Sequence, residues 1–110
     1  MAGSDYIVVL ITAPTMADAR RIARLLVEER FAACVNLLPE CRSVYRWEDD
    51  VVEESEAMMV VKTARELFPA LAKRVAEIHP YAVPEVVGLP VVEVAERYRH
   101  FLADGVRREK

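Results

Sequence analysis

The chain has little glycine, with three residues among 110. Loops that cradle phosphate groups need glycine, because side chains would keep the backbone away from the ligand. The sequence contains no Walker loop, no dinucleotide-binding glycine pattern and no nucleophile elbow. These absences exclude the common nucleotide-binding and hydrolase motifs, and they favour a protein that is not an enzyme.

Cysteine is also scarce, and both residues, Cys34 and Cys41, fall on one predicted strand. An extended chain holds them too far apart to bond to each other. Their spacing matches no zinc motif. We therefore expect two free thiols and a reducing, cytoplasmic compartment. A buried packing role suits Cys34, whereas Cys41 beside Pro39 is expected to be more accessible.

Long apolar runs and an excess of basic residues are absent as well. No run reaches the length of a membrane-spanning helix, and no basic region precedes the first strand-like segment. The formal net charge is −3 and the pI is about 5.4, which argues against nucleic acid or a membrane surface as a partner. Hydrophobic residues make up 54% of the chain, so we expect an oligomer interface to bury the surplus.

Hydrophobic periodicity predicts four strands and three helices. Thr15 and Asp18 have the form of a capping box before the first helix. Pro69 belongs in the first turn of the second helix, and Pro39 marks an edge or a bulge in the second strand. The predicted strands cover 6–12, 31–47 with a break at 39–40, 51–63 and 85–92, and the predicted helices cover 16–30, 66–79 and 93–103.

This order, βαββαβ with an extra C-terminal helix, predicts a single α+β domain over 1–110. Two right-handed crossovers joined by a hairpin give a ferredoxin-like, four-stranded antiparallel sheet with two helices on one face. The hairpin around 48–50 is long for a small domain, so its tip should overhang the sheet and contact another subunit. Gly105 is expected to cap the last helix, and residues 107–110 are expected to fray.

The segment 79–91 is the strongest candidate for a site. His79 lies at a predicted helix end, next to Tyr81 and Glu85, and Pro80 and Pro84 restrict the backbone between them. Imidazole is the commonest ligand of transition metals. A histidine at a helix end can equally serve the fold by bonding backbone carbonyls, and both interpretations stay open.

Two further candidates come from the hairpin strands. Trp47, the single tryptophan, sits at the predicted hairpin end among acidic residues, where it could anchor into a partner. Those acidic residues could hold cations weakly, although charge runs usually just face water. Lys62 lies at the end of an apolar strand. It could contact an anion in a cleft, or its aliphatic stem could pack on apolar surface while its ammonium group reaches solvent.

Four blocks in this order resemble the CutA family of divalent-cation tolerance proteins: AACVN at 32–36, SVYRW at 43–47, KT at 62–63 and HPYAVPE at 79–85. The resemblance runs from about Ile7 to Val91. It implies a ferredoxin-like protomer in a tight homotrimer, cytoplasmic in bacteria, with a role linked to copper and other divalent metals. This sequence differs from the family pattern at Ala82, where the family often has Glu, and at Phe101, which stands near the position of a usual Trp.

The resemblance also implies roles for individual residues. The metal ligands would be His79, Cys34 and Glu85, with no metal needed for folding. The ligand cleft between subunits would include Trp47, Lys62 and Tyr81, and the trimer interface would include Tyr45 and Trp47. An alternative function is that of a PII-like signalling trimer that binds a small anionic metabolite through Lys62, His79 and Tyr81. A third is an interaction module that only trimerises and presents a surface.

Overall fold

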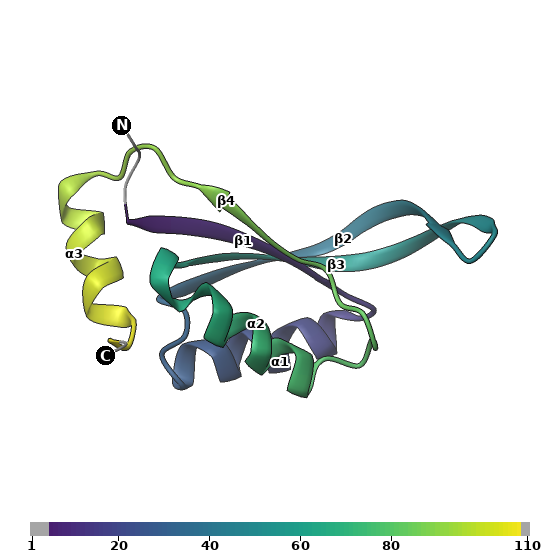
Figure 1. Ribbon diagram of the computed structural model, residues 1–110, viewed down its shortest axis with the longest axis horizontal. Coiled ribbons are helices and arrows are strands. Elements are labelled where there is room, and N and C mark those ends of the chain that lie inside the picture. The colour runs from purple at the N-terminus through teal and green to yellow at the C-terminus, as the bar shows by residue number, and fades with distance from the viewer. Residues whose placement is uncertain (1–4, 109–110) are drawn as a thin grey trace.

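The computed structural model describes residues 5–108 and has the predicted α+β architecture. One antiparallel sheet has the strand order β2-β3-β1-β4, which is the ferredoxin-like order expected from the sequence. Helices α1 and α2 lie on one side of the sheet (Figure 1). The elements are β1 Tyr6–Ala13, α1 Met16–Glu28, β2 Cys34–Trp47, β3 Asp50–Ala64, a short 3-10 turn Arg65–Leu67, α2 Phe68–Ile78, β4 Val86–Pro90 and α3 Glu96–Gly105.

The core fills the space between the sheet and the helices α1 and α2. Burial alternates along β1, because successive strand residues point to opposite faces. Inward residues from β1 and β3 pack against one stripe of each helix. The largest fully buried apolar side chains are Val9, Ile11, Ile22, Leu26, Met59, Val61, Leu67, Leu71 and Val75.

The helix starts follow the predicted chemistry. Thr15 is the N-cap of α1, and its hydroxyl accepts a hydrogen bond from the Asp18 N–H at 3.1 Å, which confirms the N-cap. The Asp18 carboxylate contacts the Thr15 hydroxyl at 3.0 Å. Pro69 falls in the first turn of α2, where its missing N–H costs nothing. Helix α2 ends at Ile78, and the backbone of the C-cap residue His79 is extended, as the following proline requires.

The opposite face of the sheet is apolar and open. Strand register places Leu10 opposite Val60 on one side and opposite Val87 on the other. Val87 and Leu89 are 47% and 43% exposed. Helices α1 and α2 both lie on the other side of the sheet, and α3 lies at one end of it (Figure 1). We call this surface the open face, and its apolar members are Val8, Leu10, Leu38, Met58, Val60, Val87 and Leu89.

Strands β2 and β3 extend beyond the sheet as a two-stranded arm (Figure 1). Strand β1 ends its pairing with β3 at Ala13 and Ala57, so residues 41–56 pair only with each other. The register of β2 shifts between Leu38 and Cys41. Pro39 therefore sits at both an edge and a bulge, as its missing N–H requires. The long hairpin was predicted correctly.

The C-terminal part differs from the sequence prediction. Strand β4 is shorter than 85–92, and α3 begins at Glu96 instead of Glu93, because residues 91–95 form neither a strand nor a helix. Gly105 is the last helical residue and has no positive φ. Its lack of a side chain has another cause: a Cβ there would lie 2.8 Å from the Cβ of Ala33.

The expected fraying is wrong for Arg107. Its backbone N–H donates to the Arg30 carbonyl at 2.8 Å, and its guanidinium donates to the Glu29 carbonyl and covers the ring of Phe31 at 4.1 Å. A cation over an aromatic face gains about 0.5–1 kcal/mol at an exposed site. The end of the chain is thereby held against α1, while residues 109–110 lie outside the described range.

Candidate functional site

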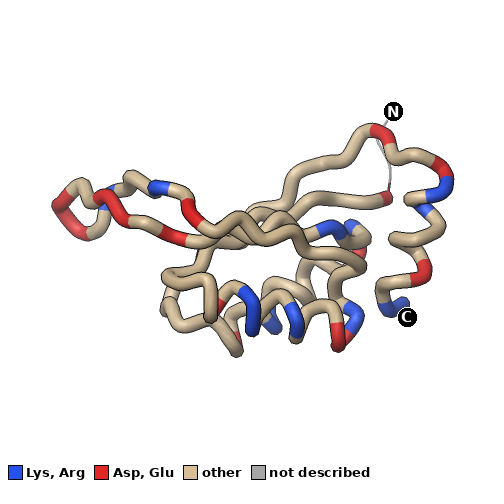
Figure 2. The backbone as a smooth tube through the Cα atoms, turned by 180° about the vertical axis from the view of Figure 1, so that it is seen from behind, with Lys and Arg blue, Asp and Glu red and all other residues tan. Residues whose placement is uncertain are grey.

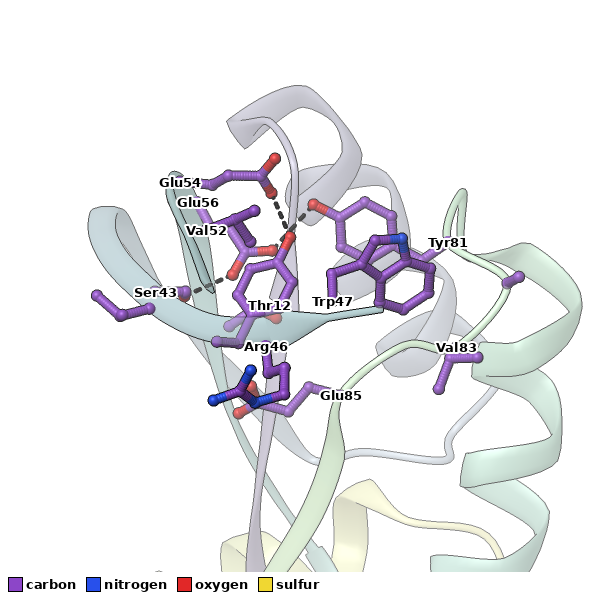
Figure 3. Close-up of a pocket in the computed structure, with 13 residues that line it drawn as sticks. Thr12, Ser43, Arg46, Trp47, Val52, Glu54, Glu56, Tyr81, Val83 and Glu85 are labelled. Atoms are coloured by element: carbon purple, nitrogen blue, oxygen red, sulfur yellow. Dashed lines mark hydrogen bonds between the residues drawn. The ribbon is translucent and has the colours of Figure 1, made fainter. Parts of the chain in front are cut away.

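A cleft of about 780 Å³ lies between the arm and the loop that follows α2. Strands β2 and β3 supply one wall, and the loop 81–85 supplies the other (Figure 3). Four of the predicted site residues line it together: Tyr45, Trp47, Tyr81 and Glu85. The full lining is Thr12, Ser43, Val44, Tyr45, Arg46, Trp47, Val52, Glu54, Glu56, Tyr81, Ala82, Val83 and Glu85.

His79 lies behind this cleft and holds the loop in place. Its side chain is buried, and Nδ1 accepts a hydrogen bond from the Tyr81 N–H at 3.0 Å. The proton is therefore on Nε2, which donates to the Thr12 carbonyl at 2.7 Å. Both nitrogens are used on the backbone, so in the protomer His79 acts as a structural residue. A metal would have to displace one of these bonds.

Tyr81 is directed toward a buried carboxylate. Its hydroxyl donates to Oε2 of Glu56 at 2.9 Å, and the Ser43 hydroxyl donates to Oε1 of the same group at 2.6 Å (Figure 3). Burial raises the pKa of Tyr81, and the bond to Glu56 raises it further, because the ionised phenol would face a negative charge. Tyr81 therefore stays a neutral donor across the physiological range.

The arm repeats this arrangement nearer its tip. The Tyr45 hydroxyl donates to Oε1 of Glu54 at 2.7 Å, and this bond raises the pKa of Tyr45. Trp47 is 56% exposed at the end of the arm. The same arm carries many of the acidic residues of the chain, whereas arginines gather on the helices (Figure 2). The arm side of the cleft is therefore aromatic and acidic.

Glu85 is the carboxyl group of the loop wall. Desolvation by its surroundings raises its pKa above 4.5, and repulsion from Glu56 adds to the increase. A carboxyl with a raised pKa binds its proton more tightly in the folded protein than in the unfolded chain. Its contribution to stability is therefore complete below the unfolded pKa and is lost as pH rises through the folded one.

Glu85→Gln is therefore expected to change the pH dependence of stability. The variant should lose less stability than the wild type as pH rises from about 4 to about 7, because glutamine has no charge to desolvate. Chemical denaturation over this range would measure the effect. Glu66→Gln, on the short turn before α2, removes the same charge elsewhere. A stability difference for Glu85→Gln that stays constant with pH would contradict this explanation.

The structure places Cys34 and Lys62 away from the cleft. They pair with each other across β2 and β3, at the end of the sheet next to α3. Lys62 Nζ donates to Oδ1 of Asn36, and the Cys34 thiol contacts Tyr98, whose pKa is raised by burial and by this contact. Both thiols are free. Within residues 5–108, no three His, Cys, Asp or Glu side chains are grouped as metal ligands.

The sequence interpretation missed Ser43, Glu54 and Glu56 as parts of the site. A signal for them was present, because residues two apart on a strand share a face. Ser43 and Tyr45 of β2 are paired opposite Glu54 and Val52 of β3. Hydroxyl groups alternate along β2 and carboxylates alternate along β3. Once the register is known, this pattern predicts the hydrogen bonds from Ser43 to Glu56 and from Tyr45 to Glu54. The register could not be predicted from the sequence, because the bulge at Pro39 shifts the pairing of β2 with β3.

The CutA1 divalent ion tolerance protein profile matches residues 7–105. The chain belongs to this family. The divalent-cation tolerance protein CutA of Thermus thermophilus is 50% identical over 88% of this chain and 94% of its own length. Mouse protein CutA is 42% identical over 92% of this chain, which spans 60% of the mouse protein.

Solved structures of CutA proteins have the same fold. The Thermus thermophilus protein superposes with a TM-score of 0.90 at 48% identity, covering 93% of this chain and 99% of that one. CutA1 of rice superposes with a TM-score of 0.92 at 36% identity, covering 94% and 95%. The CutA prediction from the residue blocks at 32–36, 43–47, 62–63 and 79–85 is confirmed.

Proposed function

We propose that the protein is a non-enzymatic homotrimer that acts in tolerance to divalent cations. The main support for an oligomer is the open face, which presents a continuous set of apolar side chains on one side of the sheet. Such patches mark protein interfaces. The overhanging arm, with Tyr45 and Trp47 exposed near its end, supplies a second contact region.

Two observations support a role without catalysis. His79, which would be the first candidate for a general base, uses both ring nitrogens on the backbone. Tyr81 is a neutral donor to Glu56. Nucleophilic catalysis needs a nucleophile within hydrogen-bond reach of a free base, and the groups of this cleft are instead committed to holding one another.

We propose a divalent metal ion, with copper as the first candidate, as a ligand of the assembly. Glu85 is an exposed carboxylate at the cleft, while His79 and Cys34 were the other predicted ligands. One protomer does not bring these three side chains together, so a complete set would need residues from two subunits. The extensive core of residues 5–108 explains why folding would not require the metal.

The alternative function as a PII-like binder of a small anion has weaker support. Its cation, Lys62, bonds Asn36 at the far end of the sheet, and Glu54, Glu56 and Glu85 line the cleft. A carboxylate or phosphate ligand would be repelled there. A role as an interaction module alone remains compatible with the open face and the arm.

The free thiols Cys34 and Cys41 suit a reducing, cytoplasmic compartment. Relatives differ in compartment by name, since the Arabidopsis protein is called chloroplastic and the Archaeoglobus protein periplasmic. No helix within residues 5–108 is long and apolar enough to cross a membrane.

Copper(II) titration by calorimetry under anaerobic conditions tests the metal proposal. Glu85→Gln is expected to weaken binding by about tenfold or more if this carboxylate is a ligand, and Cys34→Ser tests the second predicted ligand. Glu66→Gln serves as the control for the loss of one charge. Equal affinities in all four proteins would remove Glu85 and Cys34 from the metal site.

A further inference from the structure

The C-terminal helix α3 stands at one end of the sheet (Figure 1) and is attached to it by few contacts of its own. Leu102 is its one buried side chain, and no side chain caps its first turn. None of the ion pairs within residues 5–108 includes a residue of α3. Residues 91–95, which connect it to β4, form neither a strand nor a helix. Segments with so little buried surface open at a lower free energy than a packed core.

Arg107 fastens the end of this segment to helix α1. Its guanidinium donates to the Glu29 carbonyl from two nitrogens, at 2.9 and 3.1 Å, and its backbone N–H donates to the Arg30 carbonyl at 2.8 Å. The guanidinium also lies over the ring of Phe31. The accepting carbonyls follow the last turn of α1, where a positive charge is favoured by the helix dipole. Arg107 therefore supplies the polar attachment that α3 itself lacks.

Arg30 adds a second attachment in a strained backbone conformation. Its N–H donates to the Val27 carbonyl at 3.0 Å, and the next N–H, of Phe31, donates to the Leu26 carbonyl at 2.9 Å. Helices that end with this pair of bonds usually have glycine at the position of Arg30, because φ is positive there, at 66°. The Arg30 side chain donates to the Asp104 carbonyl in the last turn of α3. This bond explains why an arginine occupies a position that suits glycine.

We infer that residues 96–107 form a lid that opens as one unit from a folded core, and that Arg107 is the latch that keeps it closed. The lid lies against the start of β2, where Gly105 approaches Ala33 and Tyr98 contacts the Cys34 thiol. Opening would separate Tyr98 from Cys34. Each of these contacts is made within one chain, so the inference does not depend on a surface being free of a neighbouring subunit.

Hydrogen–deuterium exchange of the wild-type assembly, read by mass spectrometry of peptides, tests the lid. We expect the amides of α3 to exchange at least about tenfold faster than those of β1. Arg107→Ala should raise the exchange rate of α3 by about tenfold more, since hydrogen bonds of a charged donor are the stronger kind, and should leave β1 unchanged. Arg108→Ala is the matched control, because Arg108 is the next residue, is exposed and carries the same charge.

Arg30→Gly separates the latch from the stability of α1. Glycine adopts a positive φ without strain, so the amides of α1 should exchange no faster than in the wild type. The amides of α3 should exchange several-fold faster, because the bond to the Asp104 carbonyl is lost. Faster exchange of α1 in this variant would contradict the role given to Arg30.

Three results would overturn the inference. The first is wild-type exchange of α3 as slow as that of β1, as would happen if a neighbouring subunit clamped the helix. The second is an unchanged exchange rate of α3 in Arg107→Ala, which would remove the latch. The third is an equal increase for α3 and β1 in Arg107→Ala, which would show that the C-terminal segment opens only when the core unfolds.

Discussion

Val87→Asp is expected to convert the assembly into folded monomers. Val87 lies on β4 opposite Leu10 and is 47% exposed in the protomer, so an aspartate there is solvated in the isolated chain. In an assembly that buries the open face, the same carboxylate would be desolvated without a partner, which costs several kcal/mol per subunit. Light scattering would show the change in mass, and circular dichroism would show that the fold is kept.

Val27→Asp is the control for this experiment. Val27 is 40% exposed on α1, on the helical side of the sheet, so the variant carries the same change in a region outside the proposed interface. Its mass should equal that of the wild type. An unchanged mass for Val87→Asp would show that the open face at β4 is not an interface between subunits.

His79→Ala is expected to lower the free energy of unfolding by about 2–3 kcal/mol in a buffer that contains a metal chelator. The substitution leaves the Thr12 carbonyl without its imidazole donor and the Tyr81 N–H without its acceptor. An unpaired buried polar group costs about 1–3 kcal/mol, and the lost ring volume adds to it. Urea denaturation at one fixed protein concentration measures the effect.

His100→Ala provides the comparison, because His100 is the other histidine and lies exposed on α3. Its substitution should change stability by less than about 0.5 kcal/mol. If His79→Ala kept full stability without metal but abolished copper binding, the residue would be a ligand and the structural explanation would be wrong. The two interpretations that the sequence left open are thus separated by one pair of variants.

Much of the fold could be predicted because its signals are local. The β-branched run at 6–12, the N-cap at Thr15 and the proline at 69 each determine an element from a few neighbouring residues. The errors fall where tertiary contacts decide. Gly105 was expected to cap a helix by its backbone freedom, whereas its role is to allow close approach to Ala33, which is far away in sequence.

The site was predicted less completely for the same reason. Trp47, Tyr81 and Glu85 line one cleft of the protomer, whereas the cleft predicted from the resemblance lies between subunits and includes Lys62. Lys62 and Cys34 lie at the other end of the same strands. Residues on one pair of long strands share a face without sharing a site, since each residue advances the chain by about 3.3 Å. Glu56 was missed because its importance comes from burial, which only the packed loop with Tyr81 creates.

The mass of the wild-type protein in solution tests the central proposal most directly. Sedimentation equilibrium at micromolar concentration, without added metal, should give three times the chain mass of 12.5 kDa. The open face and the arm predict that this mass persists on dilution through the micromolar range. A single species of 12.5 kDa would contradict the proposal that these surfaces build a homotrimer.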